Sequence, residues 1–367
     1  MKNSFGSHLT VTLFGESHGT EIGAVMDGMA PGVPIDDEYI ASRLALRRPS
    51  DGLSTARREP DPYRFVSGVK DGYTTGAPLT VIIPNSDTRS ADYGDMDGIA
   101  RPSHADYTAY CKYHGYEDRR GGGHFSGRLT APLVALGAVA GTALFSAGIT
   151  VGTHIARLAG IDDRSFGANI EEEMDALTDC PFPVLDPQAG AAMKDAIYAA
   201  RADLDSVGGV LETAVLGMPA GVGEPWFEGV ESVLAQALFG IPAVKGVEFG
   251  GGFSMCDRRG SEVNDAFYLD REGNPCTRTN FSGGIQGGIT NGMPLLFRCA
   301  VKPTPTIGRE QETVNFVTGE PTVLRAHGRH DPAIVHRARA VVDAVTSLAL
   351  CDLLIGRYGT DFFGEDR

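Results

Sequence analysis

The sequence lacks paired cysteines and the common nucleotide-binding and hydrolase motifs. Its six cysteines are scattered with no Cys-x-x-Cys pair, which argues against both a zinc site and a disulfide framework. We therefore expect reduced, mostly buried thiols and no metal. No Gly-x-Gly-x-x-Gly opens a helix after a strand, so a Rossmann fold is unsupported. A Gly-x-Ser-x-Gly elbow and a Ser-His-Asp order are also missing, and a covalent hydrolase is not favoured.

Positive charge is scarce. Lys and Arg total 32 against 47 Asp and Glu, which gives a formal net charge of -15 over 367 residues. Because contacts to phosphates need a basic face, this balance argues against general nucleic-acid binding. The start of the sequence has no apolar run followed by a small-residue cleavage site, so we expect a cytoplasmic protein.

One stretch has no charged residue at all. Residues 129–153 are long enough to cross a bilayer, but they are rich in Gly, Ala, Ser and Thr, with Pro132 near the start. We favour a buried, closely packed helix followed by a strand over a membrane span. Glycine is abundant, with 48 residues that cluster, which suggests functional loops.

Hydrophobic patterning predicts alternating strands and helices. Asp36 is expected to cap a helix that ends near Arg48, and Asp331 followed by Pro332 makes a good start for the final helix. The 86–126 segment is polar, rich in glycine and without clear periodicity, which is typical of a functional loop. The other expected elements are strands at 8–14 and 21–29, a hairpin at 67–85, an acidic helix from 171, a second helix at 188–203, a strand at 211–219 and a helix at 232–240.

Basic residues are concentrated in a few places despite the overall negative charge. Five arginines lie close together in SRLALRRPSDGLSTARREP: Arg43, Arg47, Arg48, Arg57 and Arg58. They could form a solvated helix end, where cations complement the helix dipole. We favour an anion site, because the planar arginine fork suits phosphate and carboxylate.

A second cluster, residues 101–132, combines histidines and arginines with the triple glycine 121–123. Glycines let backbone N–H groups approach a ligand closely, and the following helix offers its N-terminal donors to an anion. The histidines, His104, His114 and His124, are ten residues apart, so acid–base work or phosphate contact is preferred to metal ligation.

Two further clusters follow. Residues 281–306 combine glycines, which form either turns or a wall against a flat ligand ring, with Lys302, Thr304 and Thr306. Residues 326–338 contain Arg329 and His330, which helix capping does not require. Together the four clusters indicate an enzyme for a multiply anionic small molecule, with a phosphate-bearing cofactor plausible.

The stretch LFGESHGTEIGA places Glu16, Ser17 and His18 side by side. Adjacent residues on a strand-to-turn segment point to different sides, so we expect no triad here. Glu16 and Ser17 are expected to support the turn.

Four motifs in this order resemble the chorismate synthase family: FGESHG, RPSHADYT with RRGGGHFSGR, GGIQGG with KPTPT, and GRHDP. The resemblance covers about residues 9–354. It implies an α+β fold, a β-α-β sandwich of antiparallel sheets and helices, in one domain over 1–367, and a homotetramer. The implied reaction is the 1,4-anti elimination of phosphate from 5-enolpyruvylshikimate-3-phosphate to give chorismate. It requires reduced FMN without net redox change, and it is the last common step of aromatic amino-acid biosynthesis.

The resemblance also implies residue roles. His18 matches a histidine beside the reduced flavin, His104 the proton donor to the departing phosphate, and Asp331 the acid that relays the abstracted proton. Arg47, Arg48 and Arg128 match positions for the anionic substrate or NADP. Ten residues match FMN-binding positions: His124, Phe125, Ser126, Gly287, Lys302, Pro303, Thr304, Pro305, Thr306 and Arg329.

The chain departs from the family pattern at two places. Many members have Arg-Ser-Ser-Ala-Arg where this chain has residues 124–128, His-Phe-Ser-Gly-Arg, and Leu53 replaces a basic residue. The first change alters the expected FMN contact and the second weakens an expected NADPH contact. NADPH or an external flavin reductase could reduce the FMN, and we favour the reductase because there is no extra nucleotide-binding insertion. The alternatives to a phosphate lyase are a flavin reductase and a non-catalytic anion-binding scaffold.

Overall fold

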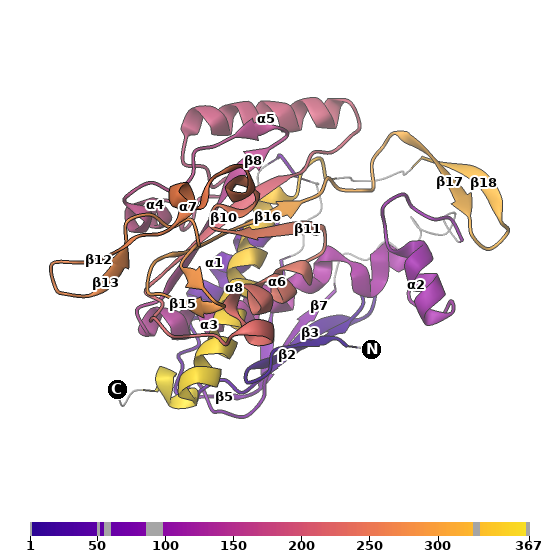
Figure 1. The fold of residues 1–367 in the computed structure, drawn as a ribbon. Helices are drawn as coiled ribbons and strands as arrows, with labels where there is room; N and C mark the ends of the chain where they lie inside the picture. The colour runs from indigo at the N-terminus through magenta and orange to yellow at the C-terminus, as the bar shows by residue number, and fades with distance from the viewer. Residues whose placement is uncertain (1, 50–51, 55–59, 86–97, 326–330, 365–367) are drawn as a thin grey trace.

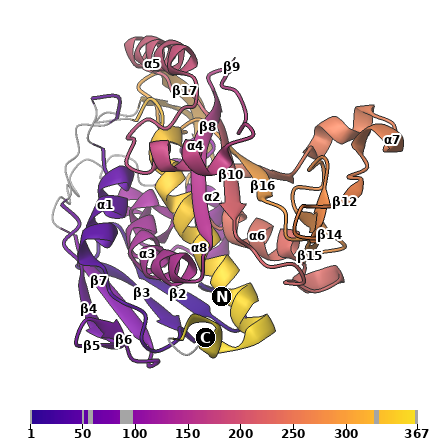
Figure 2. The ribbon, with the colours of Figure 1, turned by 90° about the vertical axis from the view of Figure 1, so that its left-hand side faces the viewer.

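The computed structural model describes residues 2–49, 52–54, 60–85, 98–325 and 331–364, and its core has three layers (Figure 1). Two five-stranded antiparallel sheets form the outer layers, with helices between them (Figure 2). The first sheet has the order β1 (Ser4–Phe5), β2 (Thr10–Gly15), β3 (Glu21–Asp27), β7 (Leu79–Pro84), β4 (Arg64–Ser67). The second has the order β11 (Val244–Phe249), β16 (Leu295–Val301), β10 (Gly209–Leu216), β8 (Thr150–Leu158), β9 (Ile161–Asp162). The predicted α+β sandwich is confirmed.

The middle layer contains α1 (Asp37–Arg47), α3 (Thr130–Ser146) and α8 (Val335–Tyr358). The carboxylate of Asp36 accepts a hydrogen bond from the backbone N–H of Tyr39 at 2.9 Å, so the predicted cap of α1 is confirmed. Helices α3 and α8 approach so closely that a Cβ on Gly137 would lie 2.4 Å from the Cβ of Ala344. This close approach requires glycine at that position and makes the helix pair a dense centre for the fold.

Helix α3 is the uncharged stretch that raised the question of a membrane. By length and composition, Gly127–Ser146 could cross a bilayer, but 72% of its most apolar window is buried inside the fold. The sequence-based interpretation of a buried helix followed by a strand is confirmed, because β8 begins four residues after α3 ends. Its apolar side chains face both sheets and α8, which accounts for their composition.

The remaining elements surround this core. The predicted helices in 171–203 are α4 (Ile170–Leu177) and α5 (Pro187–Ala202), and α6 (Val230–Phe239) follows β10 as expected. Small hairpins and one short helix extend from the layers: β5 (Val69–Lys70) with β6 (Tyr73–Thr74), β12 (Phe267–Leu269) with β13 (Pro275–Thr277), β14 (Ile285–Gln286) with β15 (Ile289–Thr290), β17 (Glu310–Asn315) with β18 (Glu320–Arg325), and α7 (Gly260–Val263).

Three local expectations were wrong. Helix α2 (Asp106–Tyr113) lies in the 86–126 segment, where no helix was expected; only Ala109 in it is buried, so it has little apolar periodicity. Helix α8 begins at Val335 rather than at Asp331, because the Asp331 carboxylate binds Arg337 instead of capping. The six cysteines are free thiols, but only Cys299 and Cys351 are buried.

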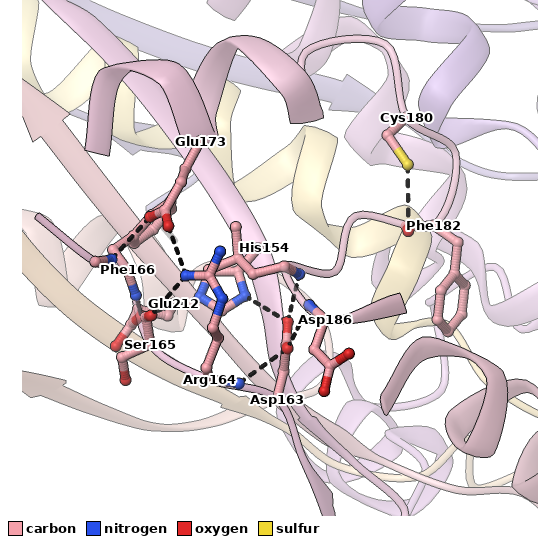
Figure 3. A network of polar contacts seen from close by, with 12 residues as sticks. His154, Asp163, Arg164, Ser165, Phe166, Glu173, Cys180, Phe182, Asp186 and Glu212 are labelled. Atoms are coloured by element: carbon pink, nitrogen blue, oxygen red, sulfur yellow. Dashed lines mark hydrogen bonds and ion pairs between the residues drawn. The ribbon is translucent and has the colours of Figure 1, made fainter. Parts of the chain in front are cut away.

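A buried charged network that the sequence did not reveal ties β8 to its neighbours (Figure 3). The Nε2 atom of His154 lies 2.9 Å from Glu212 on β10, and its Nδ1 atom lies 3.3 Å from Asp163. Asp163 also accepts hydrogen bonds from the backbone N–H groups of Leu185 and Asp186 at 2.6 and 2.9 Å. Burial alone would lower the pKa of His154, but the two carboxylates raise it.

The charge on His154 should make stability depend on pH. Its contribution is fully present below the unfolded-state pKa of about 6.5 and is lost as pH rises through the higher folded-state pKa. We expect the free energy of unfolding in urea to fall as pH rises above about 6.5, more steeply in the wild type than in His154→Leu. At low pH the variant should lose about 3–5 kcal/mol, because two buried carboxylates lose their partner. The exposed His8→Leu is the control, and equal slopes in wild type and His154→Leu would contradict the assignment.

Candidate active site

A cavity of about 1270 Å³ gathers residues from all four sequence clusters. His18, His104 and Asp331, the three predicted catalytic residues, line it together although they are far apart in the sequence. Ten of the predicted binding residues also line it: Arg47, Arg48, His124, Phe125, Ser126, Arg128, Lys302, Thr304, Pro305 and Thr306. Pro303 and Gly287 do not, the latter lying in the turn between β14 and β15, and Arg329 is outside the described residues.

His18 is fixed by its neighbour Ser17, contrary to the expectation that the two side chains point apart. The Ser17 hydroxyl lies 3.2 Å from Nδ1 of His18 and donates to the backbone carbonyl of Arg120 at 3.1 Å. Since its one proton is used there, the hydroxyl accepts from Nδ1–H. Ser17 therefore orients His18 and does not act as a nucleophile, which agrees with the expected absence of a triad.

The triple glycine brings the two histidines close to one backbone segment. All three residues have positive φ, at 60°, 90° and 55° for Gly121, Gly122 and Gly123. A Cβ on Gly121 would lie 2.0 Å from Cε1 of His18, and one on Gly122 would lie 3.4 Å from Nε2 of His104. The segment can pass against the ring of His18 only because Gly121 has no side chain, whereas a Cβ on Gly122 would make an ordinary contact with His104.

His104 lies at the start of α2 and contacts an ion pair. Its Nδ1 atom lies 3.0 Å from the carboxylate of Asp106, which Arg101 also binds at 2.6 Å. Burial would raise the pKa of Asp106, but hydrogen bonds from Arg101 and His104 hold it well below its usual range. Because an ionised carboxylate only accepts, Nδ1 of His104 carries a proton.

Two cavity arginines share one buried carboxylate. Asp61 accepts from Arg47 at 2.8 Å and also from Arg128, and its side chain is fully buried. Burial would raise its pKa, but the two guanidinium groups lower it. The other predicted arginine, Arg48, donates to the backbone carbonyl of Pro60 at 2.8 Å. The paired arginines therefore retain net positive charge beside the cavity.

Asp331 is held by Arg337, a residue that sequence reasoning did not select. The two side chains form an ion pair at 2.6 Å, and Arg337 also donates to the backbone carbonyl of Arg47 at 3.3 Å. It lies in the same cluster as Asp331, where its charge was the available signal. Arg101, Lys245 and Gln236 line the cavity as well and were also not selected.

Three buried polar atoms that belong to cavity-lining residues have no hydrogen-bond partner within the described residues: Nε of Arg47, Nε of Arg337 and Oγ1 of Thr304. Buried polar groups are normally satisfied, so these three atoms are exceptions in the part of the fold that surrounds the cavity. Lys302 donates to the backbone carbonyl and the hydroxyl of Ser103 at 2.6 and 2.8 Å. Burial and the charge of Lys245 lower its pKa.

The charge of the lining is opposite to that of the chain. Eight lysines and arginines line the cavity, against Asp331 as the one acidic residue among its described lining: Lys2, Arg47, Arg48, Arg101, Arg128, Lys245, Lys302 and Arg337. In a protein of net charge -15, such local concentration attracts an anion. The fold and site thus define an enzyme class that acts on a multiply anionic small molecule, in a cavity lined by histidine and carboxylate side chains.

Comparison with known proteins identifies the family. The model of the family described as "Chorismate synthase" matches residues 9–355 of this chain. The chain is 44% identical over 353 residues to the chorismate synthase of Pyrococcus abyssi, covering 96% of this chain and 97% of that one. It is 45% identical over 364 residues to that of Opitutus terrae, covering 96% of each. A crystal structure of chorismate synthase superimposes with a TM-score of 0.76 at 29% identity and covers 97% of this chain and 94% of that one.

The chain therefore belongs to the chorismate synthase family. Family membership and the names of its relatives support the function of a carbon–oxygen lyase in aromatic amino-acid biosynthesis. The predicted family, enzyme class and function are confirmed, and the alternative of a flavin reductase is not favoured.

Proposed function

We propose that the cavity binds 5-enolpyruvylshikimate-3-phosphate together with reduced FMN, and that the chain eliminates phosphate from this substrate to give chorismate. The observation that carries the proposal is the convergence of eight cationic side chains with His18, His104 and Asp331 on one cavity. A substrate with a phosphate ester and carboxylates needs such compensation in an acidic protein.

The residues that line the cavity fit a flavin. The volume of about 1270 Å³ exceeds the 300–1,000 Å³ or so of a pocket for one drug-sized ligand, so a cofactor and a substrate can lie together. Val341 and Leu348 of helix α8, with Ile334 just before it, form an apolar wall suited to a flat ring. The unmatched buried polar atoms of Arg47, Arg337 and Thr304 suit the polar groups of the ligands. Residues 124–126, Lys302 and residues 304–306 of the lining are proposed to hold the FMN; Gly287, Pro303 and Arg329 are proposed to contribute on the family resemblance alone.

Each catalytic side chain has a chemical task that its contacts support. The chemistry that reduced FMN would supply when bound is a transient source of electron density, with no net oxidation. As the carbon–oxygen bond to phosphate breaks, the leaving oxygen takes the bonding electrons, and His104 gives it a proton from Nε2. Asp331 accepts the proton that leaves the ring carbon, whose bonding electrons enter the new double-bond system. His18, with Nδ1 held by Ser17, holds or moves a proton at Nε2.

Further properties complete the proposal. The chain forms one domain, acts in the cytoplasm and assembles as a homotetramer. Trp226 and Phe227, 84% and 89% exposed, are candidates for burial between subunits. The FMN is reduced by an external reductase, with NADPH as a second candidate for the reductant. Arg47, Arg48 and Arg128 bind the substrate or NADP.

An anaerobic assay tests the proposal. Purified protein, the enolpyruvyl substrate and chemically reduced FMN should give chorismate and one equivalent of phosphate. Oxidised FMN with NADPH should give no turnover until a flavin reductase is added. Lack of chorismate with reduced FMN would overturn the function, whereas turnover with NADPH alone would overturn only the external reductant.

A further inference from the structure

The ring of His104 has a defined carboxylate contact on the Nδ1 side. The carboxylate of Asp106 lies 3.0 Å from Nδ1, and the side chains of His104 and Asp106 are only 19% and 10% exposed. On the other side of the ring, Gly122 lies close to Nε2. These contacts restrict the orientation of the ring within the cavity lining.

Asp106 is itself held by three hydrogen bonds from one residue. The backbone N–H, Nε and Nη2 of Arg101 donate to its carboxylate at 3.0, 2.8 and 2.6 Å. The bidentate side-chain contact fixes the plane of the carboxylate. Because Arg101 and Asp106 flank His104 in the sequence, the pair encloses the turn that carries the histidine. The carboxylate is thus placed independently of any ligand.

We propose that Asp106 is a positioning residue for the proton donor His104: it holds Nδ1–H and so directs Nε2 at the departing phosphate. The inference rests on the proposed role of His104 in eliminating phosphate. Asp106 is outside the cavity lining, whereas Arg101 and His104 reach it. Partners that orient a functional histidine in this way commonly affect its activity by about 10–100-fold.

A matched ion pair in the same segment provides a control. Glu117 binds Nε of Arg119 at 2.8 Å, and its side chain is 7% exposed, close to the 10% of Asp106. Neither Glu117 nor Arg119 lines the cavity. Glu117→Gln therefore removes a similarly buried carboxylate from an arginine pair without reaching the site, although Arg119 is more exposed than Arg101, at 26% against 9%.

The test measures kcat and KM of Asp106→Asn and Glu117→Gln in the anaerobic assay with chemically reduced FMN. We expect Asp106→Asn to lower kcat by about 10–100-fold and to change the substrate KM by less than about threefold. Glu117→Gln should keep kcat within about twofold. In a His104→Ala background, Asp106→Asn should cause no further loss beyond about twofold, because the two residues act as one unit.

Three results would overturn the inference: unchanged kcat in Asp106→Asn, an equal loss in Glu117→Gln, or a full further loss in the His104→Ala background. If Asp106→Asn does not fold, Asp106→Ser enters the same assays, since its hydroxyl can accept from Nδ1–H through a bridging water. If the wild-type protein is inactive in this assay, the proposed function itself is contradicted. The two failures are therefore distinguishable.

Discussion

Replacing His104 by alanine should lower kcat by at least about 100-fold, the smaller end of what a positioned general acid contributes. The phosphate would then leave without a proton, although the arginines that line the cavity would still attract the substrate. We therefore expect the dissociation constant of the substrate to change much less than kcat. Steady-state rates with chemically reduced FMN under anaerobic conditions, with substrate binding measured by calorimetry, separate the two effects.

His114 provides the control for this variant. It lies in the same segment, at the C-terminal end of α2, but it is exposed and does not line the cavity. Its φ of 59° is in the left-handed region, which asparagine tolerates, so His114→Asn is the suitable change. His114→Asn should retain wild-type kcat. A His104→Ala enzyme within about threefold of wild type would contradict the role of proton donor.

Local signals in the sequence predicted local structure well. Asp36 with two following acids predicted where α1 begins, and the uncharged, small-residue composition of 129–146 predicted an interior helix. The expectation for Asp331 was wrong because a proline after an aspartate is equally compatible with a cap and with a loop. The deciding contact comes from Arg337, six residues later.

The convergence of distant residues could be predicted only through family resemblance. Nothing in composition or spacing relates His18 to His104 or Asp331, yet all three line one cavity. The residues that hold these side chains in place could not be predicted either, for the same reason. Nothing in the sequence around Asp61 marks it as the shared partner of Arg47 and Arg128, a role that only the fold reveals. The His154 network likewise joins residues 9 and 58 positions apart.

The acidic protein and its basic cavity also show how charge is distributed between surface and site. Asp61 and Asp106 lie outside the lining and bind arginines that belong to it. They orient these cations and neutralise only part of the positive charge of the lining. Asp331 alone reaches the lining, among the described residues, and Arg337 binds it. The carboxylate proposed as the base is thereby kept in the cavity without leaving the site acidic.

Gly121→Ala should abolish most of the activity, because the new side chain displaces the ring of His18. The new Cβ would lie 2.0 Å from Cε1 and 2.2 Å from Nδ1 of that ring, and 2.7 Å from the Ser17 hydroxyl. Either the ring or the backbone must move by about an ångström, and a misplacement of that size costs roughly 100-fold in rate. We expect kcat to fall by at least about 100-fold, measured in the same anaerobic assay.

Gly148→Ala separates this clash from the strain that any side chain adds to a left-handed glycine. Gly148 has a φ of 76°, but a Cβ there would meet no atom within 4 Å. Both variants carry a backbone cost of about 1–2 kcal/mol, so both should unfold at lower temperature than wild type. Only Gly121→Ala displaces His18, and only it should lose activity in the folded state. Equal kcat values in the two variants would mean that the glycine is required for the conformation of the loop and not for the position of the histidine.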